Sequence, residues 1–440
     1  MSRETFSSRF GVLVTMIGVA VGLGNVWRFP YMVGEFGGAP FVLFYILMTV
    51  FIGVPALMAE WTLGRSTRRG PMGAFQESGV RGGRLIGWVF FVIVLAATAY
   101  YTNAVGWVLY HAISEVLKLV GVSLDASRIL PPDAGFDGTS FILQLISTGV
   151  VIGACSMVLM RGLKKGIERI SRFVLPMLLV ILLVLIVRGV TLPGAGAGID
   201  WYILKFDPSA LTGSVMLGAL GQAIFSLSLG GTYMVIYGSY LGENESIRSG
   251  AVWTAAGDVT AGLLAGFAIF PAVFALGLEP AAGPGLLFET LPAVFDGIPA
   301  GSFFGLLFFV GLMGAAWLSD IAAFEVMIAG LTDNTSISRP QAVWGCAVLV
   351  FLLAIPTMIN MSIFVPWDLA FGSGMQTLGA LLAVLTVGWA LKRGEVLGHL
   401  SGSDRFTRLL YLWIRYVIPV AILLVGIWWM LTDLLHVIEL

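Results

Sequence analysis

Two stretches of the chain combine glycines with polar side chains inside sequence that is otherwise apolar. Residues 18–30 read GVAVGLGNVWRFP, and residues 221–231 read GQAIFSLSLGG. Glycine destabilises a helix interior by roughly 1 kcal/mol relative to alanine, so we expect a broken helix in both places. An unwound backbone offers carbonyl oxygens that can coordinate a cation and N–H groups that can hold an anion. Together the two stretches predict a site that binds a small cation and a zwitterion.

The composition indicates what surrounds this site. Of 440 residues, 58% are hydrophobic and 11% are charged, with Lys+Arg 24 against Asp+Glu 25. Soluble domains carry roughly 25% charged residues, so most of this chain must face lipid. The near-zero net charge argues against nucleic acid as a partner. Cys155 and Cys346 are too few for a disulfide framework, and the three histidines are too scattered for a metal site.

Eleven segments are long and apolar enough to cross a bilayer, because a spanning helix needs about 20 mostly apolar residues. They lie approximately at 9–35, 38–64, 84–118, 140–160, 168–190, 211–240, 247–277, 301–331, 339–358, 363–391 and 408–434. The first segment lacks the cleavage site of a signal peptide and is expected to remain in the mature protein.

The distribution of Lys and Arg predicts the orientation. Most of these residues fall in the loops on the N-terminal side of the membrane, and positively charged loops stay in the cytoplasm. We therefore expect a multi-pass protein of the plasma (inner) membrane, with the N-terminus cytoplasmic and, after an odd number of spans, the C-terminus outside.

The two broken spans, the first and the sixth, open two successive groups of five. Corresponding breaks in two halves of a chain are typical of transporters whose binding site is formed by discontinuous helices. The sequence thus predicts an all-α integral membrane protein with 11 transmembrane helices in two inverted five-helix repeats, 1–190 and 211–391. Residues 392–440 would add a cytoplasmic loop and the last span.

The two glycine-rich runs and the succession of eleven spans resemble the neurotransmitter:sodium symporter family, in particular its bacterial members. The resemblance covers essentially the whole chain. It implies a sodium-coupled symporter that imports an α-amino acid by alternating access, and not an enzyme. The expected partners are therefore the amino acid, sodium and the lipid bilayer; the oligomeric state is left open.

The resemblance implies a first sodium site at the Ala20 carbonyl and the side chains of Asn25 and Ser226, with a polar residue of the seventh span. Asp258 takes that place when we count back from the proline of that span, whereas a shift by one residue puts Gly257 there. A fixed carboxylate at Asp258 would balance the charge of the ion, so we expect transport that needs no chloride.

A second sodium site is implied by the same resemblance at the carbonyls of Gly18, Val21 and Ala315 and the side chain of Ser319. The remaining ligand position falls on Leu318, which has no oxygen to give. The neighbouring Asp320 could compensate. The sequence therefore leaves both one and two coupled sodium ions open.

The resemblance also implies a substrate site. Its expected residues are Ala20, Leu23, Gly24, Ala97, Tyr101, Phe225, Ser226, Ser228, Gly231, Ser319 and Ala323. Gly22 leaves room for a substrate that brings its own carboxylate, which favours an α-amino acid. The small side chains at Gly231 and Ala323 predict a large pocket and a bulky hydrophobic or aromatic substrate, although Asp320 could instead favour a cationic or hydrogen-bonding side chain.

Gates on both sides of the site are implied as well. Arg28 and Asp368 would pair on the outer side, and Arg3 and Asp333, braced by Tyr240, on the inner side. Two alternatives remain open: proton-coupled or uncoupled amino-acid transport on the same fold, motivated by the leucine at the second sodium site, and an amino-acid sensor that does not transport.

Overall fold

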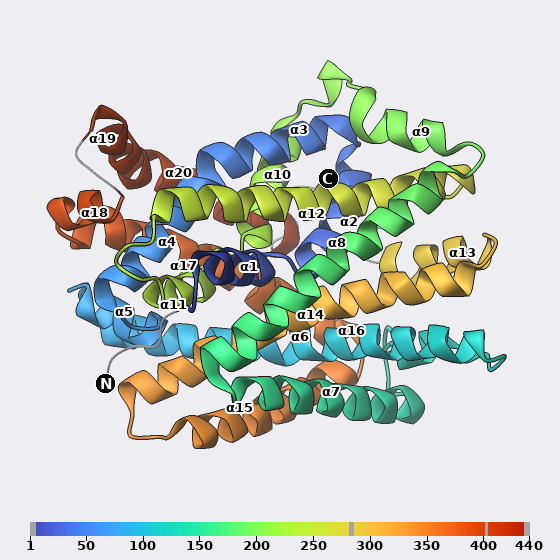
Figure 1. The fold of residues 1–440 in the computed structure, drawn as a ribbon, viewed down its shortest axis with the longest axis horizontal. Helices are drawn as coiled ribbons and strands as arrows, with labels where there is room; N and C mark the ends of the chain where they lie inside the picture. Colours follow the sequence, from blue (N-terminus) through green and yellow to red (C-terminus); the bar gives the residue numbers. More distant parts are fainter. Residues whose placement is uncertain (1–5, 281–285, 401–403, 435–440) are drawn as a thin grey trace.

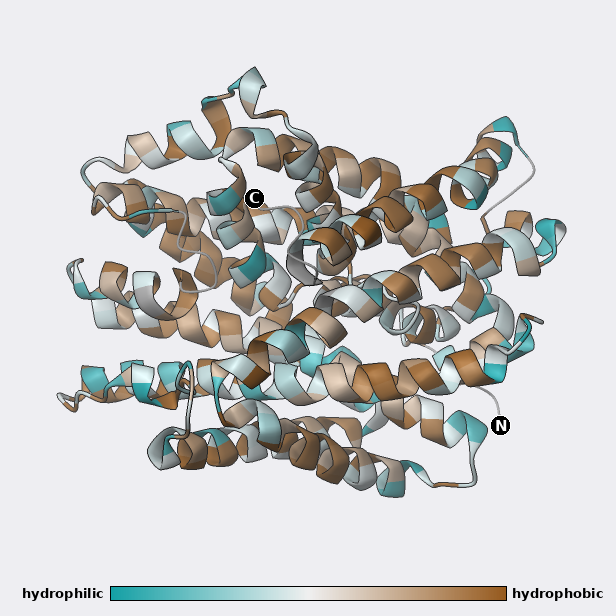
Figure 2. Cartoon of the chain, turned by 180° about the vertical axis from the view of Figure 1, so that it is seen from behind, coloured by the Kyte–Doolittle hydropathy of each residue, from teal (hydrophilic) through white to brown (hydrophobic). Residues whose placement is uncertain are grey.

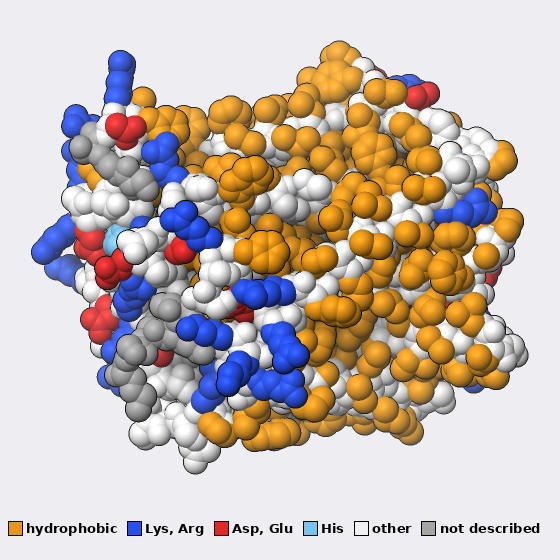
Figure 3. Space-filling view, viewed as in Figure 1, with side chains coloured by type: hydrophobic (Ala, Val, Ile, Leu, Met, Phe, Trp, Pro, Cys, Tyr) orange, Lys and Arg blue, Asp and Glu red, His pale blue; other side chains and the backbone are white. Residues whose placement is uncertain are grey.

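The computed structural model describes residues 6–280, 286–400 and 404–434, which form helices and contain no strand. Long helices lie side by side along the long axis of the molecule (Figure 1). Apolar residues cover much of their length, while hydrophilic residues are concentrated near helix ends and in loops (Figure 2). A belt of hydrophobic side chains covers much of the face in Figure 3, and Lys and Arg gather toward one end. This is the surface expected of a protein that crosses a bilayer.

The α-helices are α1 (Arg9–Ala20), α2 (Phe29–Phe36), α3 (Ala39–Met48), α4 (Val54–Thr67), α5 (Pro71–Glu77), α6 (Gly83–Leu119), α7 (Gly138–Leu159), α8 (Arg169–Val190), α9 (Ala195–Ile199), α10 (Gly213–Ser226), α11 (Tyr233–Ser239), α12 (Ile247–Ala275), α13 (Leu291–Asp296), α14 (Gly301–Asn334), α15 (Arg339–Ala354), α16 (Met361–Trp367), α17 (Met375–Leu385), α18 (Arg393–His399), α19 (Arg405–Leu412) and α20 (Ile418–Trp429). Turns of π-helix are η1 (Gly24–Arg28), η2 (Thr49–Gly53), η4 (Leu163–Glu168), η5 (Asp200–Leu204), η7 (Leu286–Thr290), η9 (Asp368–Gly374), η10 (Thr386–Ala390), η11 (Trp413–Val417) and η12 (Met430–Leu434). Turns of 3-10 helix are η3 (Ala126–Ile129), η6 (Pro208–Ala210) and η8 (Ile355–Met358).

Nine continuous helical segments of the described chain are long and apolar enough to cross a membrane, and they coincide with nine of the predicted spans. Residues 9–36 form a further candidate span, bent by 53° at its break. The predicted sixth span is divided into α10, of 14 residues, and α11, of 7 residues. The helices thus agree with the predicted segments, whereas the total of eleven spans and the inverted repeats remain predictions.

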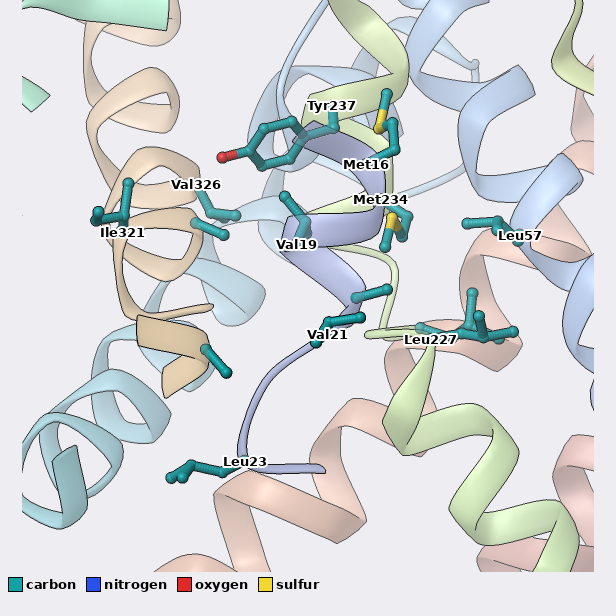
Figure 4. Close-up of a cluster of buried hydrophobic side chains, with 14 of the residues drawn as sticks. Met16, Val19, Val21, Leu23, Leu57, Leu227, Met234, Tyr237, Ile321 and Val326 are labelled. Carbon is teal, nitrogen blue, oxygen red and sulfur yellow. The ribbon is translucent and has the colours of Figure 1, made fainter. Parts of the chain in front are cut away.

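The two broken spans are held by apolar packing. In Figure 4, Met234 of α11 lies between Val19 of α1 and Leu57 of α4, and Ile321 and Val326 of α14 lie on the opposite side of α1. Met16, Leu57 and Met234 are fully buried. Apolar contacts thus hold α1 and α11, one half of each broken span, against α4 and α14.

The break in the sixth span requires residues that tolerate a left-handed backbone. Between α10 and α11 the chain passes through positive φ at Ser228 (52°) and Gly231 (67°). A Cβ atom on Gly231 would lie 2.5 Å from the carbonyl oxygen of Gly379 in α17. Glycine is needed at 231 for both reasons, which explains why a helix cannot continue here.

Candidate functional site

The first break frees backbone groups at the end of α1. The Val21 N–H still bonds the Ile17 carbonyl (2.7 Å), but the Gly22 N–H bonds Asn25 Oδ1 (3.0 Å). Within the described residues, no backbone N–H is bonded to the Ala20 carbonyl. A carbonyl freed in this way at a helix break is available to a cation.

Asn25, Ser226 and Asp258 meet beside this break. Asn25 Nδ2 donates to Ser226 Oγ (3.0 Å) and to Asp258 Oδ1 (2.7 Å), and the Ser226 hydroxyl donates to Asp258 Oδ2 (2.8 Å). Gly257 instead faces Ile17 of α1, because a Cβ on Gly257 would lie 2.8 Å from Ile17 Cδ1. Of the two residues that the sequence left open, Asp258 is the one that lies beside Asn25 and Ser226.

Tyr45 of α3 completes this cluster and was not predicted from the sequence. Its hydroxyl lies 3.2 Å from Ser226 Oγ and 3.2 Å from Asp258 Oδ2. No Lys, Arg or His of the described chain forms an ion pair with Asp258. A buried carboxylate is costly unless a cation joins it. With the Ala20 carbonyl, the cluster provides the oxygen donors that suit Na⁺.

The residues expected at the second sodium site lie where α1 packs against α14. Val21 and Ala315 are buried, each 1% exposed. Leu318 is also buried, and its Cδ1 atom lies 3.2 Å from the position of a Cβ on Gly18. Where the family resemblance implies a second oxygen ligand, α14 therefore presents an apolar methyl group to Gly18.

Asp320 does not replace the missing oxygen. Its carboxylate accepts a hydrogen bond from Thr102 of α6 (2.8 Å) and contacts Cys155 Sγ of α7 (3.4 Å). These contacts hold the carboxylate against α6 and α7, whereas Leu318 contacts α1.

A cavity of about 60 Å³ lies between the two breaks. Its walls are formed by Val19, Ala20, Gly22, Leu23, Gly24, Ala97, Tyr100, Tyr101, Phe225, Ser228, Tyr233, Ser319, Ala323 and Gln376. Most of the residues expected at the substrate site are among them. Ser226 is not, because it belongs to the Asn25 cluster. The residues that were not expected are Val19, Tyr100, Tyr233 and Gln376.

Gly231 is not in the wall of this cavity either, because it faces α17. The side chain that lines the cavity after the second break is that of Tyr233, two residues later. Placing Gly231 in the pocket was therefore wrong: the positive-φ turn directs this residue to α17, and a tyrosine supplies bulk that the sequence interpretation omitted.

Gly22 provides space at one end of the cavity. A Cβ at this position would lie 2.2 Å from Ser319 Oγ and 3.5 Å from the Tyr101 hydroxyl oxygen. The Tyr101 hydroxyl also lies beside the Leu23 backbone. Hydroxyl and N–H donors around a glycine form a place where a carboxylate can bind.

Glu60 of α4 fixes the second break and was missed by sequence reasoning. Its Oε1 atom accepts the N–H groups of Gly230 and Gly231, each at 2.9 Å. Gln222 of α10 donates to the Gly24 carbonyl (3.0 Å) and so joins the two breaks. A carboxylate inside the apolar segment 38–64 was the available signal, since such residues are retained for a function.

A larger cavity of about 470 Å³ adjoins the site and shares Tyr101 and Phe225 with it. Arg28 and Asp368 both line this cavity. The Arg28 guanidinium carbon lies 4.3 Å from the centre of the Phe225 ring, and Tyr100 hydrogen-bonds Asp368. Among the described residues, no ion pair within 4.0 Å joins Arg28 to Asp368. The two side chains expected to form the outer gate therefore line the same cavity but do not form an ion pair across it.

The expected inner gate is only partly within the described chain, because Arg3 lies outside it. The Asp333 carboxylate accepts a backbone N–H of the α4–α5 turn (3.2 Å). Tyr240 donates to Glu325 (2.6 Å), which also binds Arg339 (2.7 Å). The Glu325–Arg339 ion pair was not predicted from the sequence.

Two broken helices enclosing an oxygen-rich cluster and a small cavity define a membrane transporter of small solutes. The chain belongs to the sodium:neurotransmitter symporter family, whose model matches residues 3–120 and 138–434. It is therefore a sodium-dependent, multi-pass membrane transporter.

Several relatives are similar over nearly their full length. An uncharacterized sodium-dependent transporter of Haemophilus influenzae is 34% identical, over 97% of this chain and 98% of the relative. The sodium-dependent transporter YhdH of Bacillus subtilis is 32% identical, over 96% of both chains. The crystal structure of MhsT in complex with L-phenylalanine has a TM-score of 0.84 and 33% identity, covering 97% of this chain and 99% of that chain.

Proposed function

We propose that the protein imports an α-amino acid with a bulky hydrophobic or aromatic side chain, together with sodium. The observation that carries this proposal is the space at Gly22, beside the Tyr101 hydroxyl and the Leu23 backbone. An amine without a carboxylate would leave these donors unused, whereas an amino acid satisfies them and can complete the coordination of a neighbouring Na⁺.

Small side chains support a bulky substrate. Ala97, Ser319 and Ala323 line the cavity together with the Phe225 ring. MhsT, which is similar over nearly its whole length, has been solved with L-phenylalanine. Tyr233 reduces this space, but its ring also offers a stacking surface to an aromatic side chain.

We propose a single coupled sodium ion, held by the Ala20 carbonyl with Asn25, Ser226 and Asp258. The support for one ion is the Leu318 methyl group beside Gly18. The Asp258 carboxylate balances the charge of the ion, so transport proceeds without chloride.

The transport cycle alternates between two sides of the membrane. The cavity lined by Arg28 and Asp368 would be the outer entrance, and the contacts of Asp333 and Tyr240 would close the inner side. The inverted repeats, the cytoplasmic N-terminus and the external C-terminus belong to this proposal. Sodium and substrate raise each other's affinity by the same factor, because coupling between two binding equilibria is reciprocal.

Uptake of a panel of labelled amino acids into proteoliposomes tests the proposal. We expect accumulation of aromatic or large aliphatic amino acids with an inward Na⁺ gradient and none with the same K⁺ gradient. Replacing chloride by gluconate should leave uptake unchanged. Accumulation driven by H⁺ alone would establish proton coupling instead, and saturable binding without accumulation under any gradient would indicate a sensor.

Substrate size can be tested with Ala323→Phe, which adds a ring to the wall of the cavity. We expect this variant to lose phenylalanine uptake and to retain uptake of alanine. The control is Val348→Phe, because Val348 lies on an exposed face of α15 and the added ring does not touch the cavity. Ala347→Phe would be unsuitable as a control, since Ala347 is buried in the core. An unchanged substrate preference in Ala323→Phe would contradict the assignment of this pocket.

A further inference from the structure

An open cavity lies where α7 passes through η4 into α8, on the face predicted to be cytoplasmic. Its volume is about 730 Å³, and it is lined by Ser7, Arg161, Lys164, Lys165, Glu168, Arg169 and Arg172. Five of these seven side chains are cationic and one is acidic. The cavity is therefore suited to an anion.

The acidic side chain is already bonded. Glu168 accepts the Ser7 N–H (3.1 Å) and the Ser7 hydroxyl, and it forms an ion pair with Arg172. Arg172 also donates to Ser8, whose hydroxyl caps α1 at the Gly11 N–H (3.1 Å). One of the five cations is thus used to hold the start of α1 against α8.

The other four cations have no such partner. Arg161, Lys164, Lys165 and Arg169 are exposed, and no hydrogen bond or ion pair of their side chains occurs within the described chain. Four positive charges gathered around one concavity repel one another. A bound anion would relieve that repulsion.

Cations elsewhere on the same side of the protein are used differently. Arg65 donates to the Glu245 carbonyl (2.5 Å), Arg68 to the Leu241 carbonyl (2.5 Å) and Arg69 to the Asp333 carbonyl (2.6 Å). Those arginines fasten helix ends together. Exposed cations such as Arg81, Arg84 and Lys392 are likewise unbonded within the described chain, but they do not line this cavity. The four residues at the α7–α8 connection differ because they gather around one concavity.

The cavity lies at the edge of the apolar belt. Met157, one helical turn before Arg161, and Phe173, directly after Arg172, have exposed fractions of 64% and 67%. Figure 3 shows a group of Lys and Arg side chains directly beside the hydrophobic surface on this face. A ligand here can place a charged group among the cations and apolar chains against Met157 and Phe173, which is the chemistry of a phospholipid.

We propose that the α7–α8 connection binds the phosphate-bearing headgroup of an anionic phospholipid through Arg161, Lys164, Lys165 and Arg169. Basic pockets on the cytoplasmic side of membrane helices hold such headgroups electrostatically. The bound headgroup lies next to the Glu168–Arg172 pair and hence next to the anchored start of α1. This binding does not depend on which solute the protein transports.

The test compares two triple variants that remove the same charge. The first variant changes the proposed site and carries Lys164→Gln, Lys165→Gln and Arg169→Gln. The second variant changes exposed cations outside the site and carries Arg81→Gln, Arg84→Gln and Lys392→Gln. Each protein is reconstituted in phosphatidylcholine containing spin-labelled phosphatidylglycerol, and the lipid immobilised on the protein is measured. We expect wild type and the second variant to select phosphatidylglycerol over phosphatidylcholine, and the first variant to lose that selectivity by about tenfold.

Equal losses in the two variants would mean that only overall surface charge matters, and no loss in either would mean that the cavity holds no lipid; both results overturn the proposal. Inorganic phosphate is added as a competitor, and full displacement of phosphatidylglycerol by millimolar phosphate would assign the cavity to a free anion instead. Matching thermal unfolding curves of the three proteins in detergent would show that the substitutions leave the fold intact.

Discussion

At the scale of single residues, Gly22 is the position whose smallness the site most clearly requires. Replacing it by alanine would place a Cβ 2.2 Å from Ser319 Oγ. Ser319 would have to rotate away from Tyr101, so we expect Gly22→Ala to weaken amino-acid binding on the order of tenfold, about 1.4 kcal/mol. Gly153→Ala is the matched control, because no atom lies within 4 Å of a Cβ there. Equal binding by the two variants would contradict a carboxylate site at Gly22.

A second residue-scale prediction concerns Asp320. The Thr102 hydroxyl lies 2.7 Å from the Thr98 carbonyl and 2.8 Å from Asp320 Oδ1, yet it has one hydrogen to give. The Thr102 hydrogen is therefore shared between the Thr98 carbonyl and the Asp320 carboxylate, which also accepts the Cys155 thiol (3.4 Å). Asp320→Asn keeps an acceptor oxygen for Thr102, whereas Asp320→Ala leaves a cavity and costs about 2 kcal/mol. Thermal unfolding should rank Asp320→Asn near wild type and Asp320→Ala well below it; equal stability of the two variants would contradict this role of the side-chain oxygen.

At the scale of elements, Glu60 is expected to control the position of α11. One carboxylate oxygen accepts two backbone N–H groups at the break. Glu60→Ala leaves both donors without a partner in a buried site and should cost about 2–4 kcal/mol, with a large loss of substrate affinity because the cavity wall shifts. Glu60→Gln keeps an acceptor oxygen and should lose less of both. Calorimetry measures the substrate affinity of each variant, and thermal unfolding measures its stability. If Glu60→Ala and Glu60→Gln were indistinguishable in both measurements, Glu60 would not hold the break through an acceptor oxygen.

The elements also show which features were accessible from the sequence. The apolar segments were located closely because a bilayer demands long hydrophobic runs, and the breaks were located because glycine and polar residues interrupt them. Tyr45, Glu60 and Tyr233 were missed because their roles depend on contacts between distant segments. Gly231 was misplaced because the positive-φ turn directs it toward α17.

At the scale of the whole molecule, the proposed single sodium site at Asp258 predicts how much work the sodium gradient can do. For a zwitterionic substrate without a membrane potential, a ~10-fold sodium gradient sustains about 10-fold accumulation with one coupled ion and about 100-fold with two. We expect this protein to reach the lower limit in proteoliposomes short-circuited with potassium and valinomycin. Accumulation well above about 10-fold under these conditions would rule out coupling to a single ion.

The same argument predicts what an oxygen at position 318 would do. Leu318→Thr provides a hydroxyl next to Ser319 and to the end of α1, so we expect a steeper sodium dependence of uptake and an accumulation limit that rises toward that of two ions. Leu312→Thr is the matched control, since Leu312 is equally buried in α14 but does not contact Gly18. Both variants lose apolar burial and should be destabilised by similar amounts. A difference between them in the sodium dependence of uptake is then caused by the change at the contact between α1 and α14. If both variants retain the sodium dependence of the wild type, position 318 has no part in ion coupling.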